Sequence, residues 1–103
     1  MMNMQKMMKQ AQDLQKNMKV AQADIEATTF YGTSAQDLVK VAFTGDRKMT
    51  NIDIASDLID PEDPETLSDM IAQAVNSALV DIDKTTEQNL ANLQKAYRFD
   101  HII

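Results

Sequence analysis

The stretch "DLVKVAFTGDRKMTNIDIA" (residues 37–55) contains two apolar alternations separated by a polar turn. Before the turn, a large apolar residue occupies every second position from Val39 to Phe43, and Ile52 and Ile54 repeat this spacing after it. Successive side chains of a β-strand point to opposite faces, so a period of two is typical of a strand with one buried face. A Gly-Asp pair inside the turn favours a tight reversal. We therefore predict two antiparallel strands joined by a short connection.

A third strand is predicted immediately upstream. The segment "IEATTFYG" (residues 25–32) is rich in threonine and aromatic residues, which favour strands, and it ends at Gly32. The connections between the three segments are short, and strands joined in this way lie antiparallel. We predict a three-stranded antiparallel meander over residues 25–56.

Residues 1–24 predict a long helix, because they contain no glycine or proline and many glutamine, lysine, alanine and methionine residues. Apolar residues recur at heptad spacing from Met4 to Ile25, which places them on one side of the helix. We call this line of residues the seam. It consists of Met4, Met7, Ala11, Leu14, Met18, Ala21 and Ile25.

A second long helix is predicted over residues 61–96. Either Asp60 or Asp63 is suited to be its N-cap, with Pro61 or Pro64 in the first turn. One broad side of this helix is apolar and consists of Leu67, Met70, Ile71, Ala74, Val75, Ala78, Leu79 and Ile82. We predict a single domain over residues 1–103, of the α+β class, with the order α-β-β-β-α. In this domain the second helix covers the three-stranded antiparallel sheet.

The seam of the first helix has no partner in this arrangement, because the second helix already covers the sheet. A domain of 103 residues is also small enough for a monomer to be marginally stable. We therefore predict a homodimer with the seam as its interface. The seam is able to pair with its own copy or to dock on the partner's sheet or second helix, and the sequence leaves these alternatives open.

The composition argues against an enzyme. The chain has no cysteine and one histidine, His101, so it offers no thiolate nucleophile, no cysteine zinc site and no pair of histidines for a metal. Its two glycines form no phosphate-binding loop. No apolar run approaches the roughly 20 residues of a membrane span. We expect a cytoplasmic protein that is not an enzyme and that has no cofactor, metal, small-molecule substrate or membrane partner.

Seven acidic residues between Asp53 and Asp69 admit two interpretations. A calcium site would require alternating carboxylates and a glycine at the turn, and this spacing has neither. Helix capping requires carboxylates just before and inside the first turn of the second helix, where several of them lie. Capping is the better explanation.

Charge is unevenly distributed along the chain. The net charge is −6, yet residues 1–50 carry seven lysines and arginines against five acidic residues, whereas residues 51–103 carry three against eleven. A negative net charge disfavours nucleic acid as a partner of the whole molecule. The first helix nevertheless has four lysines away from the seam, for which composition alone favours a solubilising role. They are Lys6, Lys9, Lys16 and Lys19.

Three segments together resemble the YbaB/EbfC family of bacterial nucleoid-associated proteins. They are "MMKQAQDLQKNMKVAQ" (residues 7–22), "LVKV" (38–41) and "IDIASDLIDPEDPETLSDMIAQAVNSAL" (52–79). The resemblance extends over about residues 4–93. It implies a tweezer-like homodimer that binds double-stranded DNA with little sequence specificity. It further implies a nucleoid-associated protein that contributes to nucleoid organisation or gene regulation.

The resemblance also implies which residues contact DNA, because contact in the family is attributed to helices that project from the dimer. Lys9 lies inside the matched "MKQAQ" segment and is the first candidate. The remaining candidates on the first helix are Lys6, Lys16 and Lys19. Those on the second helix are Lys84, Lys95 and Arg98.

The alternative function is a dimeric scaffold or protein-interaction module without nucleic-acid binding. The acidic second half and the methionine-rich seam favour it, and so does the small number of aromatic residues for stacking on bases.

Overall fold

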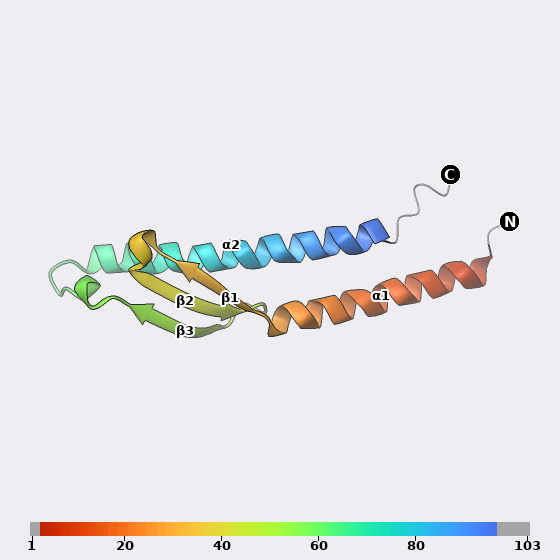
Figure 1. Ribbon diagram of the computed structural model, residues 1–103, viewed down its shortest axis with the longest axis horizontal. Coiled ribbons are helices and arrows are strands. Elements are labelled where there is room, and N and C mark those ends of the chain that lie inside the picture. Colours follow the sequence, from red (N-terminus) through yellow and green to blue (C-terminus); the bar gives the residue numbers. More distant parts are fainter. Residues whose placement is uncertain (1–2, 97–103) are drawn as a thin grey trace.

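The protein is described by a computed structural model over residues 3–96. Helix α1 (Met4–Ala27) is followed by strands β1 (Thr29–Thr33), β2 (Val39–Thr44) and β3 (Met49–Ile54) and by helix α2 (Pro64–Ala96), as Figure 1 shows. Short 3-10 turns lie between β1 and β2 (Ala35–Asp37) and after β3 (Ser56–Leu58). The predicted α+β fold with the order α-β-β-β-α is confirmed.

The three strands form one antiparallel sheet in the order β1-β2-β3. Phe30 lies opposite Phe43 across the first pair, and Val41 lies opposite Ile52 across the second. The register shifts between Ala42 and Phe43, so that Phe43 lies opposite Met49. The predicted antiparallel meander is therefore present, with a β-bulge in its second pair.

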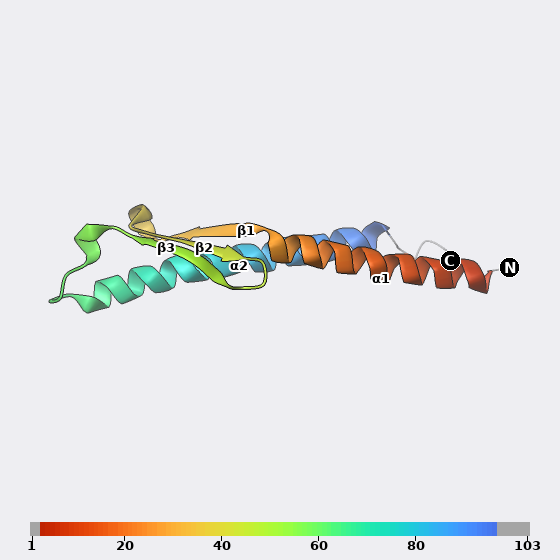
Figure 2. The same cartoon turned by 90° about the horizontal axis from the view of Figure 1, so that it is seen from below.

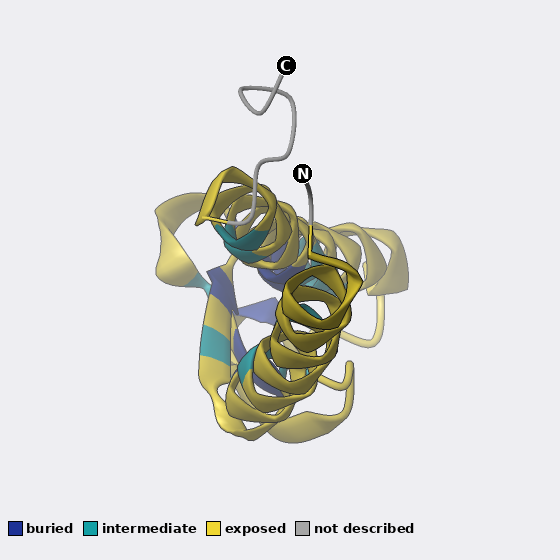
Figure 3. Ribbon diagram, turned by 90° about the vertical axis from the view of Figure 1, so that its right-hand side faces the viewer, coloured by how far each residue is buried: buried dark blue, intermediate teal, exposed yellow. Residues whose placement is uncertain are grey.

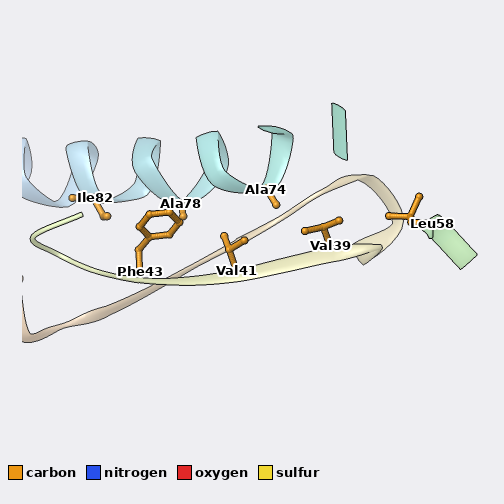
Figure 4. Close-up of a cluster of buried hydrophobic side chains, with 7 residues drawn as sticks. All are labelled: Val39, Val41, Phe43, Leu58, Ala74, Ala78 and Ile82. Carbon is orange, nitrogen blue, oxygen red and sulfur yellow. The ribbon is translucent and has the colours of Figure 1, made fainter. Parts of the chain in front are cut away.

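Helix α2 packs on one face of the sheet, over β1 and β2. The apolar residues of β2 point toward a line of small and branched residues on α2 (Figure 4). This core consists of Val39, Val41, Phe43, Leu58, Ala74, Ala78 and Ile82. Removing this apolar surface from water is the main favourable contribution to folding.

The backbone of α2 lies directly against β1 at Gly32. A β-carbon on Gly32 would lie 2.6 Å from the backbone nitrogen of Ala78 and 2.8 Å from the Ala78 β-carbon. A glycine on the strand and alanines on the helix therefore allow this close approach.

Helix α1 ends three residues later than the sequence predicted. The predicted helix over residues 1–24 and strand from residue 25 are wrong at this boundary, because Ile25 and Ala27 are helical. The C-cap of the helix is Thr28, whose backbone is extended. Its hydroxyl donates to the backbone oxygen of Asp24 at 2.6 Å, and its N–H donates to that of Ile25 at 3.0 Å. These bonds satisfy carbonyl groups of the last turn.

Helix α2 begins at Pro64, not at the predicted residue 61. The Asp63 carboxylate accepts hydrogen bonds from the Thr66 N–H at 3.3 Å and from the Thr66 hydroxyl at 2.6 Å. Asp60 instead accepts from the N–H of Glu62 at 3.0 Å, within the preceding turn. Of the two predicted caps, Asp63 is the one that precedes the helix, with Pro64 at its first position.

The molecule is elongated, with extents of 73 × 23 × 16 Å. Helix α1 and the second half of α2 lie side by side and project beyond the sheet (Figures 1 and 2). We call α1 together with residues 82–96 of α2 the arm, and residues 28–81 the body.

Candidate nucleic-acid interface

A cleft of about 350 Å³ separates the two helices where the arm meets the body. Its apolar lining comes from the seam of α1 and from the facing side of α2, and consists of Met18, Ala21, Ile25, Ile82, Leu90 and Leu93. Since these residues face each other, they define the inner side of each helix. The opposite side of each helix is its outer side.

All four lysines of α1 are exposed and lie away from the cleft. Lys9 and Lys16 are two helical turns apart, about 10 Å along the axis, on the side opposite Met18 and Ile25. Lys6 and Lys19 flank this line, one on each side. None of the four forms an ion pair within the described residues. We call Lys6, Lys9, Lys16 and Lys19 the α1 ridge.

The α1 ridge carries little opposing charge. Asp13, four residues after Lys9 and three before Lys16, lies among the lysines and is the one acidic residue of α1 before Asp24, so this side of the helix keeps a net positive charge. The start of α1 is capped by the Asn3 side chain, which accepts from the N–H of Gln5 at 3.0 Å. The resulting surface is an exposed band of cations suited to contact with phosphates.

The two described candidates on α2 occupy a different surface. Lys84 and Lys95 are exposed and lie three turns apart on one side of the helix, about 16 Å along its axis. Helical geometry places this side opposite Ile82 and Leu93, which line the cleft. We call Lys84 and Lys95 the α2 ridge. Arg98, and likewise His101, lie outside the described residues.

The structure therefore does not bring the predicted lysines together on one surface. The α1 ridge and the α2 ridge lie on opposite outer sides of the arm, because each lies opposite the cleft-lining side of its own helix. Figure 3 shows the two adjacent helices from the free end of the arm. Helical spacing groups lysines within one helix, but it carries no information on how two helices face each other. This placement is decided by the packing around the cleft.

One part of the seam packs within the protomer, and the other part is exposed to solvent. Ile25 is buried within the protomer, with 8% of its surface exposed, and Met18 and Ala21 line the cleft. Leu14 is half-buried, whereas Met4 is 76% and Met7 42% exposed. The first half of the seam is therefore the part left open to a partner. The use of the seam as a dimer interface stays a prediction.

A second apolar surface, which the sequence did not predict, lies on β3. Met49 and Ile52 belong to the face of the sheet that α2 covers, yet they are 44% and 39% exposed. The reason is that α2 packs over β1 and β2 and does not extend across β3. A period of two identifies the inward side chains of a strand, but not whether one helix is wide enough to cover them.

Two residues of the turn between β2 and β3 contact the helices of the arm, and neither was among the predicted site residues. Gly45 lies against the last turn of α1, and its N–H donates to the Thr28 backbone oxygen at 3.1 Å. Arg47 donates to the carboxylate of Asp83 on α2 in an exposed ion pair. The sequence marked Gly45 only as a turn residue, because the contact with Ile25 comes from a distant part of the chain.

Acidic residues gather at the end of the molecule away from the arm. The end of β3, the turn after it and the start of α2 form this tip (Figure 1). They carry Asp53, Asp57, Asp60, Glu62, Asp63, Glu65 and Asp69, and no lysine or arginine occurs over residues 49–83. Within residues 3–96, no group of three or more histidine or acidic side chains is arranged to hold a metal ion. The molecule is thus an electric dipole along its long axis.

The turn between β2 and β3 contains the one described acid with a clearly shifted pKa. The Thr44 hydroxyl hydrogen-bonds to the Asp46 carboxylate, and this bond lowers the pKa of Asp46 below its usual value of 3.8. Lys48 lies 3.6 Å from that carboxylate and favours its charged form further.

Neither described helix is long and apolar enough to cross a membrane.

The sequence model described as the YbaB/EbfC DNA-binding family matches residues 1–97. The chain is 61% identical over 99 residues to nucleoid-associated protein LL0120 of Lactococcus lactis subsp. lactis, covering 96% of this chain and 100% of that protein. It is 59% identical over 90 residues to nucleoid-associated protein SUB1611 of Streptococcus uberis, covering 87% and 91%.

A solved structure shares the fold. The crystal structure of HP0035 from Helicobacter pylori superposes with a TM-score of 0.63 at 21% identity, covering 79% of this chain and 93% of that chain.

Proposed function

The chain belongs to the YbaB/EbfC DNA-binding family, and we propose that it is a nucleoid-associated protein that binds double-stranded DNA as a homodimer with little sequence specificity. The observation that carries the proposal is the α1 ridge. Four exposed lysines on a projecting helix, without an ion pair among the described residues, offer cations to the phosphates of a duplex.

The proposed lack of sequence preference follows from the same side chains. Lysine contacts with phosphates fix a protein on the duplex but do not read the bases. Neither α1 nor the described part of α2 carries an aromatic side chain that stacks on bases or wedges between them. Binding is therefore expected to depend on phosphate charge and to fall steeply with salt.

The charge distribution orients the duplex. The acidic tip repels phosphates, while the α1 ridge attracts them at the other end of the molecule. A net charge of −6 is compatible with DNA binding when the opposing charges are separated in this way.

A homodimer is the second part of the proposal, and the exposed apolar surfaces support it. Met4, Met7 and Ala11 leave the first half of the seam uncovered, and Met49 and Ile52 leave β3 uncovered. A second copy would remove such surface from water. Two protomers also double the number of basic ridges, in a tweezer-like arrangement of two arms.

The decisive experiment is fluorescence anisotropy of a labelled random-sequence duplex, titrated with protein at several salt concentrations. If each protomer neutralises two or three phosphates, the slope of log affinity against log salt is about −4 to −5. The Lys9→Glu/Lys16→Glu variant should lose binding. The matched control, Lys40→Glu/Lys48→Glu, makes the same change in charge on the body and should bind like the wild type. Binding that ignores salt, or equal losses in both variants, would contradict the proposal.

A dimeric scaffold without nucleic-acid binding is the competing function, and the uncovered apolar surfaces are the observation in its favour. The two functions differ in their response to substitution in the cell. A scaffold should tolerate Lys9→Glu/Lys16→Glu and be inactivated by Met7→Asp or Leu14→Asp. The DNA-binding proposal predicts loss of activity in both cases.

A further inference from the structure

We propose that the arm binds two separate DNA duplexes at once, one on each outer side, so that the protein bridges duplexes. This inference rests on the proposed function and assigns the α2 ridge the role of a second duplex site.

The α2 ridge has the character of a phosphate-binding surface. Lys84, Gln88, Ala91 and Lys95 succeed each other along one side of α2, so this stripe contains two cations and no acid. Asp81 lies one turn before Lys84 at the body end of this stripe, and Glu87 lies on a neighbouring side. Asp83 is already paired with Arg47. A short basic stripe therefore remains, with polar and small residues that let a duplex approach closely.

The two ridges are held in opposite directions by the packing between them. The seam residues Met18 and Ile25 face Ile82 and Leu93 across the cleft, which turns the lysines of both helices outward. Gly45 and the Arg47–Asp83 pair fix α1 and α2 to the same turn of the body. Rotating either helix so that its lysines faced the other helix would break this packing.

A single duplex does not reach both ridges of one arm. The ridges extend about 16–20 Å along their helices, whereas duplex DNA stays straight over about 500 Å. A duplex on the α1 ridge therefore runs past the arm without wrapping around it. Phosphates that contact the α2 ridge must belong to a second duplex or to a distant part of the same one.

The unequal sizes of the ridges predict an order of binding. The α1 ridge has four lysines and the α2 ridge two, so the first duplex occupies the α1 ridge. Fewer phosphate contacts give weaker binding of the second duplex. Bridging should therefore disappear at lower salt than the binding of one duplex.

The test is a co-retention assay with the protein of residues 1–103. One duplex is fixed to beads, a second fluorescent duplex is free, and the retained fluorescence measures bridging. The key variant is Lys84→Gln/Lys95→Gln, and the matched control is Lys40→Gln/Lys48→Gln. Single-duplex anisotropy is measured in parallel for every protein, and circular dichroism verifies folding.

We expect the wild type and the control to retain the free duplex. The α2 variant should retain at least about fivefold less, while its affinity for one duplex changes by no more than about twofold. Unchanged bridging by the α2 variant would overturn the inference, because it would assign bridging to the α1 ridges of two arms. A wild type that binds one duplex but retains no second would also overturn it and leave the proposed function standing. A wild type that binds no duplex would refute both.

Discussion

Gly45 packs against the backbone of Ile25 so closely that a β-carbon on Gly45 would overlap the Ile25 carbonyl oxygen. This contact joins the turn between β2 and β3 to the last turn of α1, and so sets the direction in which the arm leaves the body. The φ angle of Gly45 is not in the left-handed region, so the backbone conformation does not require a glycine here. The lack of room for a β-carbon does.

Replacing Gly45 with alanine should destabilise the protein through this overlap. We expect Gly45→Ala to lower the free energy of unfolding by about 2–3 kcal/mol, because backbone atoms of Ile25 have little freedom to move aside. Urea denaturation followed by circular dichroism measures the change. A variant as stable as the wild type would show that the turn and α1 are not in contact in solution.

Arg47 forms an ion pair and also adopts an unfavourable backbone conformation. Two substitutions distinguish the effects of these two features on stability. Its φ angle of 67° lies in the left-handed region, which glycine adopts more easily than alanine. Arg47→Ala and Arg47→Gly both remove the exposed pair with Asp83, worth at most about 1 kcal/mol. The glycine variant should therefore be more stable than the alanine variant by about 0.5–1 kcal/mol.

Thermal or urea unfolding of these two Arg47 variants supplies the comparison. Equal stability would mean that the turn adopts another conformation in solution.

The pKa of Asp46 should depend on Thr44. The hydrogen bond from the Thr44 hydroxyl lowers the pKa of Asp46 below 3.8, so its contribution to stability is present above pH 3.8 and is lost as the pH falls through the lower folded value. Thr44→Val removes the donor and should raise the pKa toward 3.8. Carboxyl-detected NMR titration of both proteins measures the shift, and an unchanged Asp46 pKa would contradict the assignment.

The first half of the seam should be required for dimerisation. Met7→Asp places a charge among exposed apolar residues and should shift the dimer toward monomer in sedimentation equilibrium, because an unpaired carboxylate is costly to bury. Gln12→Asp adds the same charge on the outer side of α1 and serves as the control. If Ile52→Asp dissociates the dimer while Met7→Asp does not, the interface lies on β3 instead.

Local patterns in the sequence predicted the elements well. The alternation from Val39 to Phe43 identified the central strand, and the apolar side of the second helix correctly included Ala74, Ala78 and Ile82. Both follow from backbone geometry, which repeats every two residues in a strand and every 3.6 in a helix. Boundaries were less accurate, because Asp60 and Asp63 are equally good caps by type and only their hydrogen bonds distinguish them.

The site was predictable only within each helix. Heptad spacing correctly separated the lysines of α1 from the seam, yet it placed Ile25 in a dimer interface although this residue is buried in its own chain. Residues on one helix share a side by local geometry alone. Whether that side meets solvent, a partner or the same chain depends on contacts with distant residues.

The sequence by itself determined the order of the elements, the inward sides of the strands and the separation of cations from apolar residues on α1, since each is encoded by short-range periodicity. The tertiary structure alone decided that the α1 and α2 ridges face in opposite directions, that β3 stays partly uncovered and that the acidic tip lies far from the arm. The physical reason is that these features are set by contacts between segments distant in the chain, Gly45 with Ile25 and Arg47 with Asp83, and no repeat along one segment specifies them.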